Sequence, residues 1–299
     1  MLHGIALKYF VEVARTGSLA AASETLHVAV SAISRQISKL EQDLGASLFE
    51  RMPRGMVLTR SGELLAEHAR RVLLEADAVI GEISAGAAQG SGLVRIACTE
   101  GFTRSFLPGV LARHRAGAPN ARYVLRAGTP AQVEHWVATG EVDIGIAFSS
   151  GSASPSHVEY AVGMPVRALL GPTHPLASHY RITLADLQAY PIALLERSTT
   201  VRQLFDLCCS ARGVRIEPLL SSNNSAALHA FAALTGAITL GSEVSLKGRA
   251  GGKALIARPI DEPLLNQRML EVTTMRERRL PVVVKDLLAV LKRELGDEG

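Results

Sequence analysis

The sequence predicts an α/β chain with a small all-α-type domain at its N-terminus and a two-lobed α/β domain behind it. Three observations support this fold class. Short stretches with helical apolar spacing fill about the first 60 residues, a proline-free heptad pattern continues to about residue 90, and strands then alternate with helices. The length of 299 residues agrees with about two domains, at roughly 150 residues per domain.

Composition excludes several classes of protein. Hydrophobic residues make up 47% of the chain, enough for a core, and no run of about 18 apolar residues predicts a membrane span. The first residues lack the basic and apolar segments of a secretory signal. Cys98, Cys208 and Cys209 are too few and wrongly spaced for a disulfide framework or a four-ligand zinc site, although a redox role for one of them stays open. We therefore expect a soluble, cytoplasmic protein with no membrane partner, metal or other cofactor.

The first two helices are predicted by apolar spacing and by their end signals. Apolar residues from Leu7 to Ala14 recur every three or four positions, and Gly17 suits the left-handed conformation that ends a helix. Ser18 then offers a side-chain oxygen to the first amides of a second helix over residues 19–26. This second helix is short and rich in alanine, so it can pack closely on its neighbours.

The third helix, which begins near residue 30 and ends at Gly45, has two different faces. One is an apolar stripe with spacings of four, three and four residues, formed by Ile33, Ile37, Leu40 and Leu44. The face almost opposite is polar, with Ser34 and Lys39 at its sides, and is formed by Ser31, Arg35, Ser38 and Gln42. Such groups reach phosphates and base edges in a DNA major groove without steric bulk, and the alternative is a face that only contacts solvent.

A small hairpin follows this helix. Residues 47–59 predict two short strands around a Pro-Arg-Gly turn, with Arg54 at the tip. An arginine on a narrow loop suits a DNA minor groove or a phosphate. Arg51 either contacts DNA as well or pairs with Glu50 or Glu41. Three helices and a hairpin together predict a winged helix-turn-helix, and this context favours the DNA-binding interpretation of the third helix over the solvated one.

Residues 7–62 resemble the winged helix-turn-helix of LysR-type transcriptional regulators. The matching residues stand at fixed spacings without insertions and are Leu7, Phe10, Gly17, Ser18, Ala21, Ala22, Leu26, Ser34, Gln36, Ile37, Leu40, Glu41, Leu44, Gly45, Leu48, Phe49, Arg51, Arg54, Leu58, Thr59 and Gly62. The chain departs from the family at Ala29-Val30-Ser31, where Ser-Gln-Pro or Ser-Gln-Ser is usual. Val30 offers only apolar contact, for example with a thymine methyl group.

The resemblance implies a sequence-specific regulator that binds a double-stranded DNA operator. The net charge of +4, from 32 Lys and Arg against 28 Asp and Glu, does not identify this partner by itself, so the placement of the charges must do so. We predict DNA contacts from Ser31, Ser34, Arg35, Ser38, Lys39, Arg51, Arg54 and Thr59.

A long helix is predicted from Ser61 to about Gln89, with Thr59 or Ser61 as its N-cap. Its apolar residues repeat at heptad spacing and are Leu65, Ala69, Val72, Ala76, Val79 and Ile83. The alternative is an ordinary core helix, but its position after a DNA-binding unit favours a linker helix that forms dimers. A dimer would present two recognition helices to two operator half-sites.

The remaining two thirds of the chain predict a mostly parallel α/β architecture. Strands are expected at residues 93–98, 123–127, 142–148, 166–170, 192–195, 215–220, 237–240 and 271–275. Helices are expected at residues 105–115, 131–139, 184–187, 201–212, from 226 onwards, and 281–295. The last strand and helix return to the first half, which gives one lobe of residues 91–163 and 267–299 and a second of residues 164–266. This arrangement resembles, more loosely, the effector domain of the same family, which is similar to periplasmic solute-binding proteins.

A small-molecule effector is expected between the two lobes, beyond the carboxyl ends of the strands. Free amides at helix starts together with hydroxyl groups favour an anion such as a carboxylate, although each Ser or Thr taken alone is as well explained as a helix cap. Glu100 would repel a simple anion, so the effector is expected to carry an amine or a hydroxyl too. The predicted contacts are Thr99, Glu100, Gly101, Phe102, Thr103, Thr129, Phe148, Ser149, Ser198, Thr199, Thr200, Val201, Ser222 and Asn223.

The sequence contains none of the motifs HExxH, paired CxxC, GxSxG or GxxxxGK[ST], and no GxGxxG follows a strand, so we predict no enzyme. The predicted organisation is a DNA-binding domain (1–60), a linker and dimerisation helix (61–90) and an effector domain (91–299). We expect a homodimer or homotetramer that joins through the linker helix and the effector domain. One alternative is an α/β solute-binding protein or enzyme fused to an unrelated helical domain. A protein that packages DNA without sequence preference is disfavoured by the nearly balanced charge.

Overall fold

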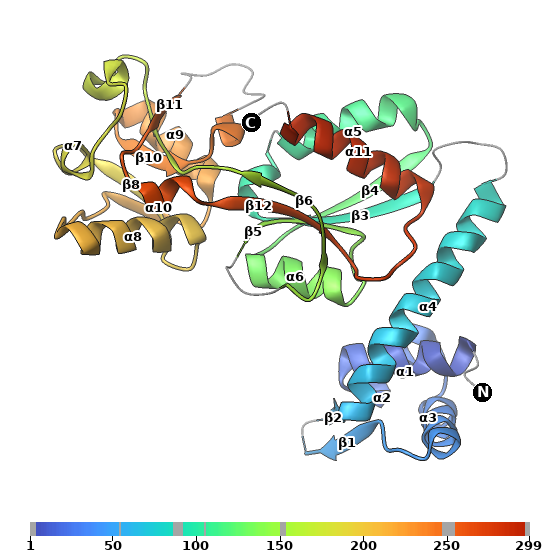
Figure 1. Ribbon diagram of the computed structural model, residues 1–299. Coiled ribbons are helices and arrows are strands. Elements are labelled where there is room, and N and C mark those ends of the chain that lie inside the picture. Colours follow the sequence, from blue (N-terminus) through green and yellow to red (C-terminus); the bar gives the residue numbers. More distant parts are fainter. Residues whose placement is uncertain are drawn as a thin grey trace. The chain divides into compact units, whose positions relative to one another are not determined.

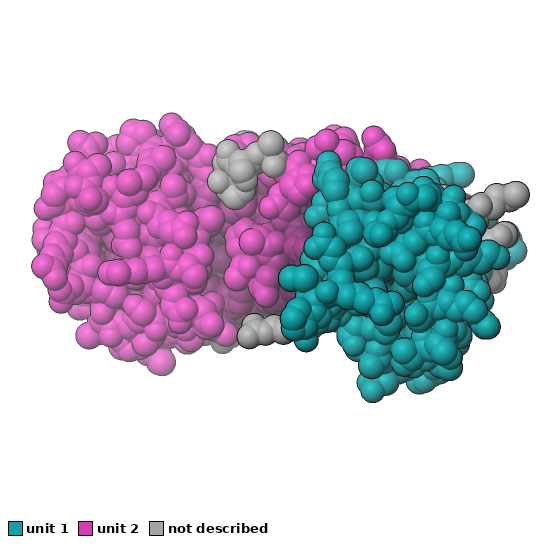
Figure 2. All heavy atoms as spheres, turned by 90° about the horizontal axis from the view of Figure 1, so that it is seen from below, with its two compact units in different colours: residues 1–86, 278–281 teal, residues 87–277, 282–299 magenta. Residues whose placement is uncertain are grey.

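The computed structural model describes residues 4–53, 55–85, 92–104, 106–149, 154–246 and 255–296. The chain divides into two compact units, coloured separately in Figure 2. Unit 1 contains residues 1–86 and 278–281, and unit 2 contains residues 87–277 and 282–299.

Unit 1 is a winged helix-turn-helix, and its elements agree with the predicted ones (Figure 1). They are α1 (Gly4–Thr16), α2 (Leu19–Leu26), α3 (Val30–Leu44), β1 (Phe49–Met52), β2 (Gly55–Leu58) and α4 (Arg60–Ala85). The predicted apolar stripe of α3 packs into the core as far as Leu40, but Leu44 is 44% exposed, so its assignment to the core was wrong. The reason is the left-handed Gly45, which turns the chain so that Leu48 and Phe49 enter the core instead.

The long helix α4 has two different halves. Leu65 and Ala69 are buried in the core of unit 1, whereas Val72 is 38% exposed and Ile83 is 75% exposed. The core-helix alternative therefore applies only to the first turns, and the later heptad residues form an exposed apolar stripe. The Gly62 amide donates to the Thr59 hydroxyl at 3.0 Å, which confirms Thr59 as the N-cap. The predicted end of this helix, residues 86–89, lies outside the described residues.

Unit 2 contains two five-stranded sheets, one in each lobe. The first has the order β4-β3-β5-β12-β6, from β3 (Gly92–Cys98), β4 (Ala121–Ala127), β5 (Ile144–Phe148), β6 (His157–Gly163) and β12 (Met269–Thr274). The second has the order β11-β7-β10-β8-β9, from β7 (Arg167–Leu170), β8 (Ile192–Leu195), β9 (Leu220–Ser222), β10 (Ile238–Gly241) and β11 (Ile256–Pro259).

The prediction of mostly parallel sheets was wrong, because both sheets are mixed. Strand β12 pairs antiparallel with β5 and β6, and β7 pairs antiparallel with β10 and β11. The chain leaves the first lobe along β6 and re-enters it along β12, and two strands that leave and return side by side run in opposite directions. Neither β6 nor β11 was predicted.

The predicted strand at residues 215–220 was also wrong for most of its length. The strand β9 begins only at Leu220, while Val214 and Ile216 pack against the core of the second lobe without strand pairing. Pro218 has no amide hydrogen to donate to a neighbouring strand, which explains why the ladder starts after it.

Helices cover both sheets and set the positions of the strand ends. In the first lobe, α6 (Pro130–Ala138) lies against one face of the sheet, and α5 (Phe106–Gly117) and α11 (Val282–Gly296) lie together against the other (Figure 1). The remaining elements are η1 (Glu100–Phe102), η2 (Pro175–Ser178), α7 (Leu184–Gln188), α8 (Thr200–Arg212), α9 (Ser225–Thr235), η3 (Glu243–Leu246) and α10 (Pro263–Asn266).

Candidate functional site

The outer face of α3 carries the side chains that the sequence predicted there. Ser31, Arg35, Ser38 and Lys39 are exposed, and Ser34 is half-buried. Within the described ranges, neither Arg35 nor Lys39 takes part in an ion pair or a side-chain hydrogen bond. The opposite face of the helix is fixed in the core. The helix therefore presents to solvent the hydrogen-bond donors of Arg35 and Lys39. Val30, at the start of this helix, is 42% exposed.

The hairpin after α3 is a wing in which Met52 pairs with Gly55, and the tip residue Arg54 lies outside the described residues. Arg51 is exposed. The Glu41 carboxylate accepts hydrogen bonds at Oε1 from the Leu48 and Phe49 amides, at 2.8 and 3.4 Å. Among the residues described here, no ion pair joins Arg51 to Glu41 or to Glu50, so the structural alternative for Arg51 finds no support.

The Thr59 hydroxyl already has two structural partners. It donates to the Ser47 carbonyl oxygen at 2.7 Å and accepts from the Gly62 amide at 3.0 Å. These bonds join the wing to the start of α4. A DNA contact from Thr59 stays a prediction, and this hydroxyl would have to share its hydrogen with a phosphate.

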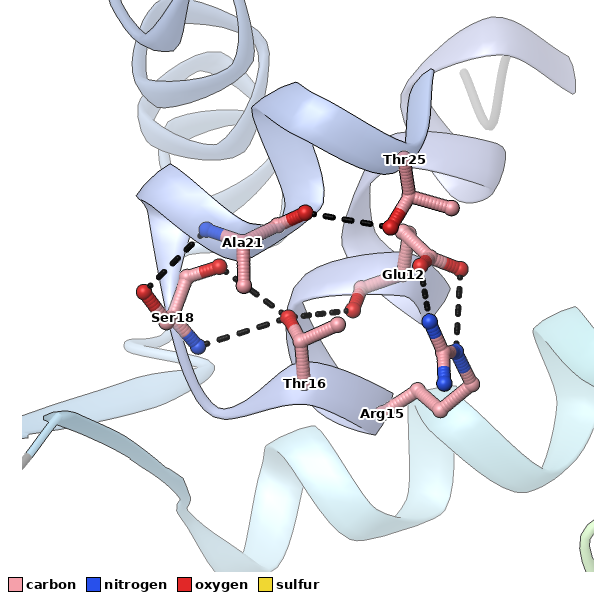
Figure 3. Close-up of polar contacts among 6 residues, drawn as sticks. All are labelled: Glu12, Arg15, Thr16, Ser18, Ala21 and Thr25. Atoms are coloured by element: carbon pink, nitrogen blue, oxygen red, sulfur yellow. Dashed lines mark hydrogen bonds and ion pairs between the residues drawn. The ribbon is translucent and has the colours of Figure 1, made fainter.

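Polar contacts also surround the turn between α1 and α2 (Figure 3). The Ser18 hydroxyl accepts from the Ala21 amide at 3.3 Å, which confirms Ser18 as the N-cap of α2. Arg15 donates from Nε and one terminal nitrogen to the two carboxylate oxygens of Glu12. Its hydrogen bonds lower the pKa of Glu12 from the usual range, with burial acting in the opposite direction.

A cavity of about 430 Å³ lies between the two lobes of unit 2. Most predicted effector contacts line it, namely Thr99, Glu100, Gly101, Phe102, Thr129, Phe148, Ser198, Thr199, Thr200, Val201 and Asn223. Thr103, Ser149 and Ser222 do not. Thr103 donates its hydroxyl to the Glu100 carbonyl oxygen, the Ser222 hydroxyl accepts from the Asn224 amide, and Ser149 lines a smaller, separate cavity in the first lobe.

Several of these hydroxyls are helix caps, as the alternative interpretation held. Thr129 caps α6 by accepting from the Gln132 amide, and Thr199 caps α8 by accepting from the Arg202 amide at 3.4 Å. The next two amides of α8, at Thr200 and Val201, are at positions that have no acceptor within a helix, and both residues line the cavity. The Thr99 hydroxyl is buried and has no hydrogen-bond partner within the described part of the chain.

Glu100 joins the two lobes across this cavity. Its carboxylate Oε2 accepts from the Ser225 amide at 3.0 Å and from the Ser225 hydroxyl at 2.7 Å, at the start of α9. The negative charge therefore faces the positive end of a helix in the other lobe. This geometry weakens the expectation that Glu100 repels an anionic effector, because its charge is already partly balanced.

Sequence analysis missed several cavity residues, of which Arg268 and Ser225 matter most because their polar groups make the contacts described here. Arg268 is 5% exposed, and its guanidinium carbon lies 3.6 Å from the centre of the Phe148 ring. The other missed wall residues are Ala127, Gly128, Pro130, Gln132, Leu195, Glu196, Asn224, His229, Leu240, Gly241, Ser242 and Ser245. No sequence signal marks Arg268, because it stands directly before a strand rather than after one. Ser225 directly follows the predicted Asn223 region, at the start of a predicted helix, and that signal was available.

The cysteines have the character of core residues. Cys98, Cys208 and Cys209 are all buried and free. Burial raises the pKa of Cys98 to about 12 and that of Cys209 to about 11, so neither thiol ionises readily near neutral pH. In the described part of the chain, no group of three His, Cys, Asp or Glu side chains is arranged to hold a metal ion, and no helix is long and apolar enough to cross a bilayer.

Comparison with known families defines the class of protein. Residues 5–63 match the bacterial regulatory helix-turn-helix protein, lysR family, and residues 87–296 match the LysR substrate binding domain. The two units are thus the DNA-binding part and the effector-binding part of a bacterial regulator. The chain belongs to the LysR family of transcriptional regulators and is not an enzyme.

Individual relatives agree with this assignment. The transcriptional regulator AlsR of Bacillus subtilis is 30% identical over 212 residues, which are 70% of this chain and 70% of AlsR. Full-length OxyR from Pseudomonas aeruginosa has a TM-score of 0.70 at 18% identity, covering 99% of this chain and 95% of OxyR. Full-length CbnR in complex with its target DNA has a TM-score of 0.56 at 21% identity, covering 98% and 100%. At these identities the two structures show a common fold alone.

Proposed function

We propose that this regulator binds an operator as a homodimer or a dimer of dimers, and that a small anionic effector, such as a carboxylate, bound between the lobes changes its DNA contacts. The observation that carries the proposal is the cavity, which is lined from both lobes by most of the residues predicted to bind the effector. Binding there would alter the angle between the lobes. The linker helices would then change the spacing of the DNA-binding units, so effector and DNA must affect each other's binding reciprocally.

The chemistry of the cavity wall supports an anion. The wall contains the positive end of α8, the buried Arg268 guanidinium and the Thr99 hydroxyl, which has no hydrogen-bond partner among the described residues. Leu195, Val201 and Leu240 supply apolar surface for the rest of the molecule. A cavity of this size suits a small organic acid.

The proposed contacts with DNA and with a second copy are made by residues of unit 1. The proposed DNA contacts are Ser31, Ser34, Arg35, Ser38, Lys39, Arg51, Arg54 and Thr59. The apolar stripe on the later turns of α4, with Val72, Val79 and Ile83 exposed, supports pairing through the linker helix. A regulator of transcription acts where the chromosome lies, so we place this one in the bacterial cytoplasm.

The test has two parts. A thermal-shift screen against small carboxylates and aromatic acids identifies an effector, because a ligand that binds only the folded state raises Tm with concentration. Operator footprinting is then performed with and without that compound. We expect the footprint or the affinity to change, whereas an unchanged footprint and affinity would contradict the allosteric part. A variant Ile83→Asp is expected to weaken the dimer in sedimentation experiments while leaving effector binding intact.

A further inference from the structure

Arg268 is a buried positive charge that forms no ion pair with any residue that the structure describes. The side chain is 5% exposed, and its Nε donates to the Met164 carbonyl oxygen at 3.1 Å. Its Nη1 lies below the protein surface with no hydrogen-bond partner within the described residues. No ion pair involves Arg268 within the same ranges, and the Glu100 carboxylate is bound to Ser225 instead.

Burying the Arg268 guanidinium in this way lowers the stability of the ligand-free protein. A buried guanidinium is stabilised when a carboxylate or another acceptor satisfies its donors, and an unmade bond leaves the desolvation cost uncompensated. The face of Phe148, 3.6 Å from the guanidinium carbon, offsets part of the charge but accepts no conventional hydrogen bond. Burial lowers the pKa of Arg268 to about 9, and the group still carries its charge at neutral pH.

Arg268 also lies at the junction between the lobes. Its carbonyl oxygen accepts from the Met164 amide at 2.8 Å, so Arg268 and Met164 are joined by two hydrogen bonds. Met164 follows β6, which leaves the first lobe, and Arg268 precedes β12, which returns to it. These two segments, which cross between the lobes at Met164 and at Arg268, are called the crossing segments. A ligand held by Arg268 would therefore be attached to the crossing segments themselves.

We propose that Arg268 is the residue that recognises the effector's carboxylate, with Nη1 donating to a carboxylate oxygen and Phe148 supporting the guanidinium plane. This rests on the proposed function and assigns its specificity to one side chain. The ligand class is a small organic acid whose carboxylate is deprotonated. Its neutral amide binds far more weakly, because the amide oxygen can accept a hydrogen bond from Nη1 but brings no negative charge to the buried guanidinium. The bound carboxylate acts on the crossing segments, which is where a change in lobe angle must occur.

The test uses the full chain and four named probes: benzoate, lactate, and their neutral amides benzamide and lactamide. Wild type is expected to show a concentration-dependent rise in Tm with at least one of the acids and a much smaller rise with its amide. Arg268→Gln should weaken that binding by about 10- to 150-fold, the range for a lost hydrogen bond to a charged group. Arg268→Lys should retain part of the affinity, since it keeps the charge but loses the planar donor pair.

Arg181→Gln is the matched control, because Arg181 pairs with Asp261 on the surface of the second lobe, away from the cavity wall. It should bind the same acid as wild type does. A crystal structure of wild type with that acid keeps the test decisive if Arg268→Gln fails to fold, since a carboxylate oxygen must then lie within hydrogen-bond distance of Nη1.

The outcomes separate the two proposals. If an acid binds in the cavity but away from Nη1, or binds Arg268→Gln as tightly as wild type, the role of Arg268 is wrong and the anionic effector stands. If neither acid stabilises wild type at millimolar concentration and neither appears beside Nη1 in soaked crystals, the assignment of Arg268 to such small acids is overturned. The anionic effector itself is overturned only by the wider screen for stabilising carboxylates.

Discussion

The outer face of α3 and the wall of the interlobe cavity are both polar, but their side chains are held in different ways. On α3, Arg35 and Lys39 are exposed and without ion pairs among the described residues, and only the buried side of the helix contributes to the core. In the cavity, Glu100 and Ser225 bind each other across the lobes. Substitutions on the α3 face should therefore change binding without changing stability, whereas substitutions in the cavity wall should change both.

The largest effect is expected from Arg35→Ala on operator affinity. Loss of a base or phosphate contact by an arginine in the major groove costs about 1–3 kcal/mol, and loss of a phosphate contact also lowers the salt slope of binding by about one. The Tm of the variant should equal that of wild type, because Arg35 has no partner to lose within the described ranges. Binding titrations at several salt concentrations, together with thermal unfolding, measure both quantities.

Arg122→Ala is the control for this experiment. Arg122 is an exposed arginine on β4 of unit 2, so its loss removes the same charge from a different surface. Operator affinity that falls equally in both variants would contradict a specific role for α3. A large fall in Tm for Arg35→Ala would contradict the separation of binding from stability.

The Glu100–Ser225 contact should show the opposite behaviour. A double-mutant cycle with Glu100→Ala and Ser225→Ala is expected to give a coupling free energy of about 1–2 kcal/mol in urea unfolding, since a hydrogen bond to a charged group connects the two side chains. The Ser225→Ala variant keeps the backbone amide that also donates to Glu100, and this limits the measured coupling free energy. Additive single effects would mean that the hydrogen bond between the two side chains contributes nothing to stability.

The same contrast explains which parts of the molecule were predictable from sequence. Helix ends in unit 1 depend on residues within one turn, such as Gly17 and Ser18, and these predictions were confirmed. The segments after β3 and before α8 that line the cavity were also predictable, because a strand end followed by a helix start is a local signal. Leu44 was misassigned because helical spacing alone cannot tell where the chain turns away from the core.

Long-range pairing accounts for what the sequence did not indicate. The antiparallel pairs of β12 join segments more than 100 residues apart, and no local pattern specifies their direction. Arg268 reaches the cavity only because β12 returns beside β6, so its chemistry becomes visible once the crossing segments are placed. The exposed pattern on α3 needed no such information, since it follows from the period of one helix.

A smaller effect is expected from helix caps within unit 1. Ser18 caps α2, whereas Ala29, the N-cap of α3, makes no side-chain hydrogen bond. Ser18→Ala should lower the free energy of unfolding of unit 1 by about 1 kcal/mol, and Ala29→Ser should raise it by a similar amount. Denaturant unfolding of both variants checks the pair. Equal effects of the same sign would show that capping does not control either helix.

The smallest effect is expected at Glu12, and it should appear only at low pH. Arg15 lowers the pKa of Glu12 in the folded state, so the folded protein binds this proton less readily than the unfolded chain does. The stabilisation is complete above the unfolded value, about 4.3 for an ordinary glutamate, and is lost as pH falls through the lower folded value. The Arg15 side chain is 49% exposed, so solvent screening keeps the effect small.

The stability difference between wild type and Glu12→Gln should therefore stay constant from neutral pH to about 5.5 and shrink below that. In an Arg15→Met background the same comparison should lose most of its pH dependence, and an undiminished dependence would show that Arg15 is not the cause.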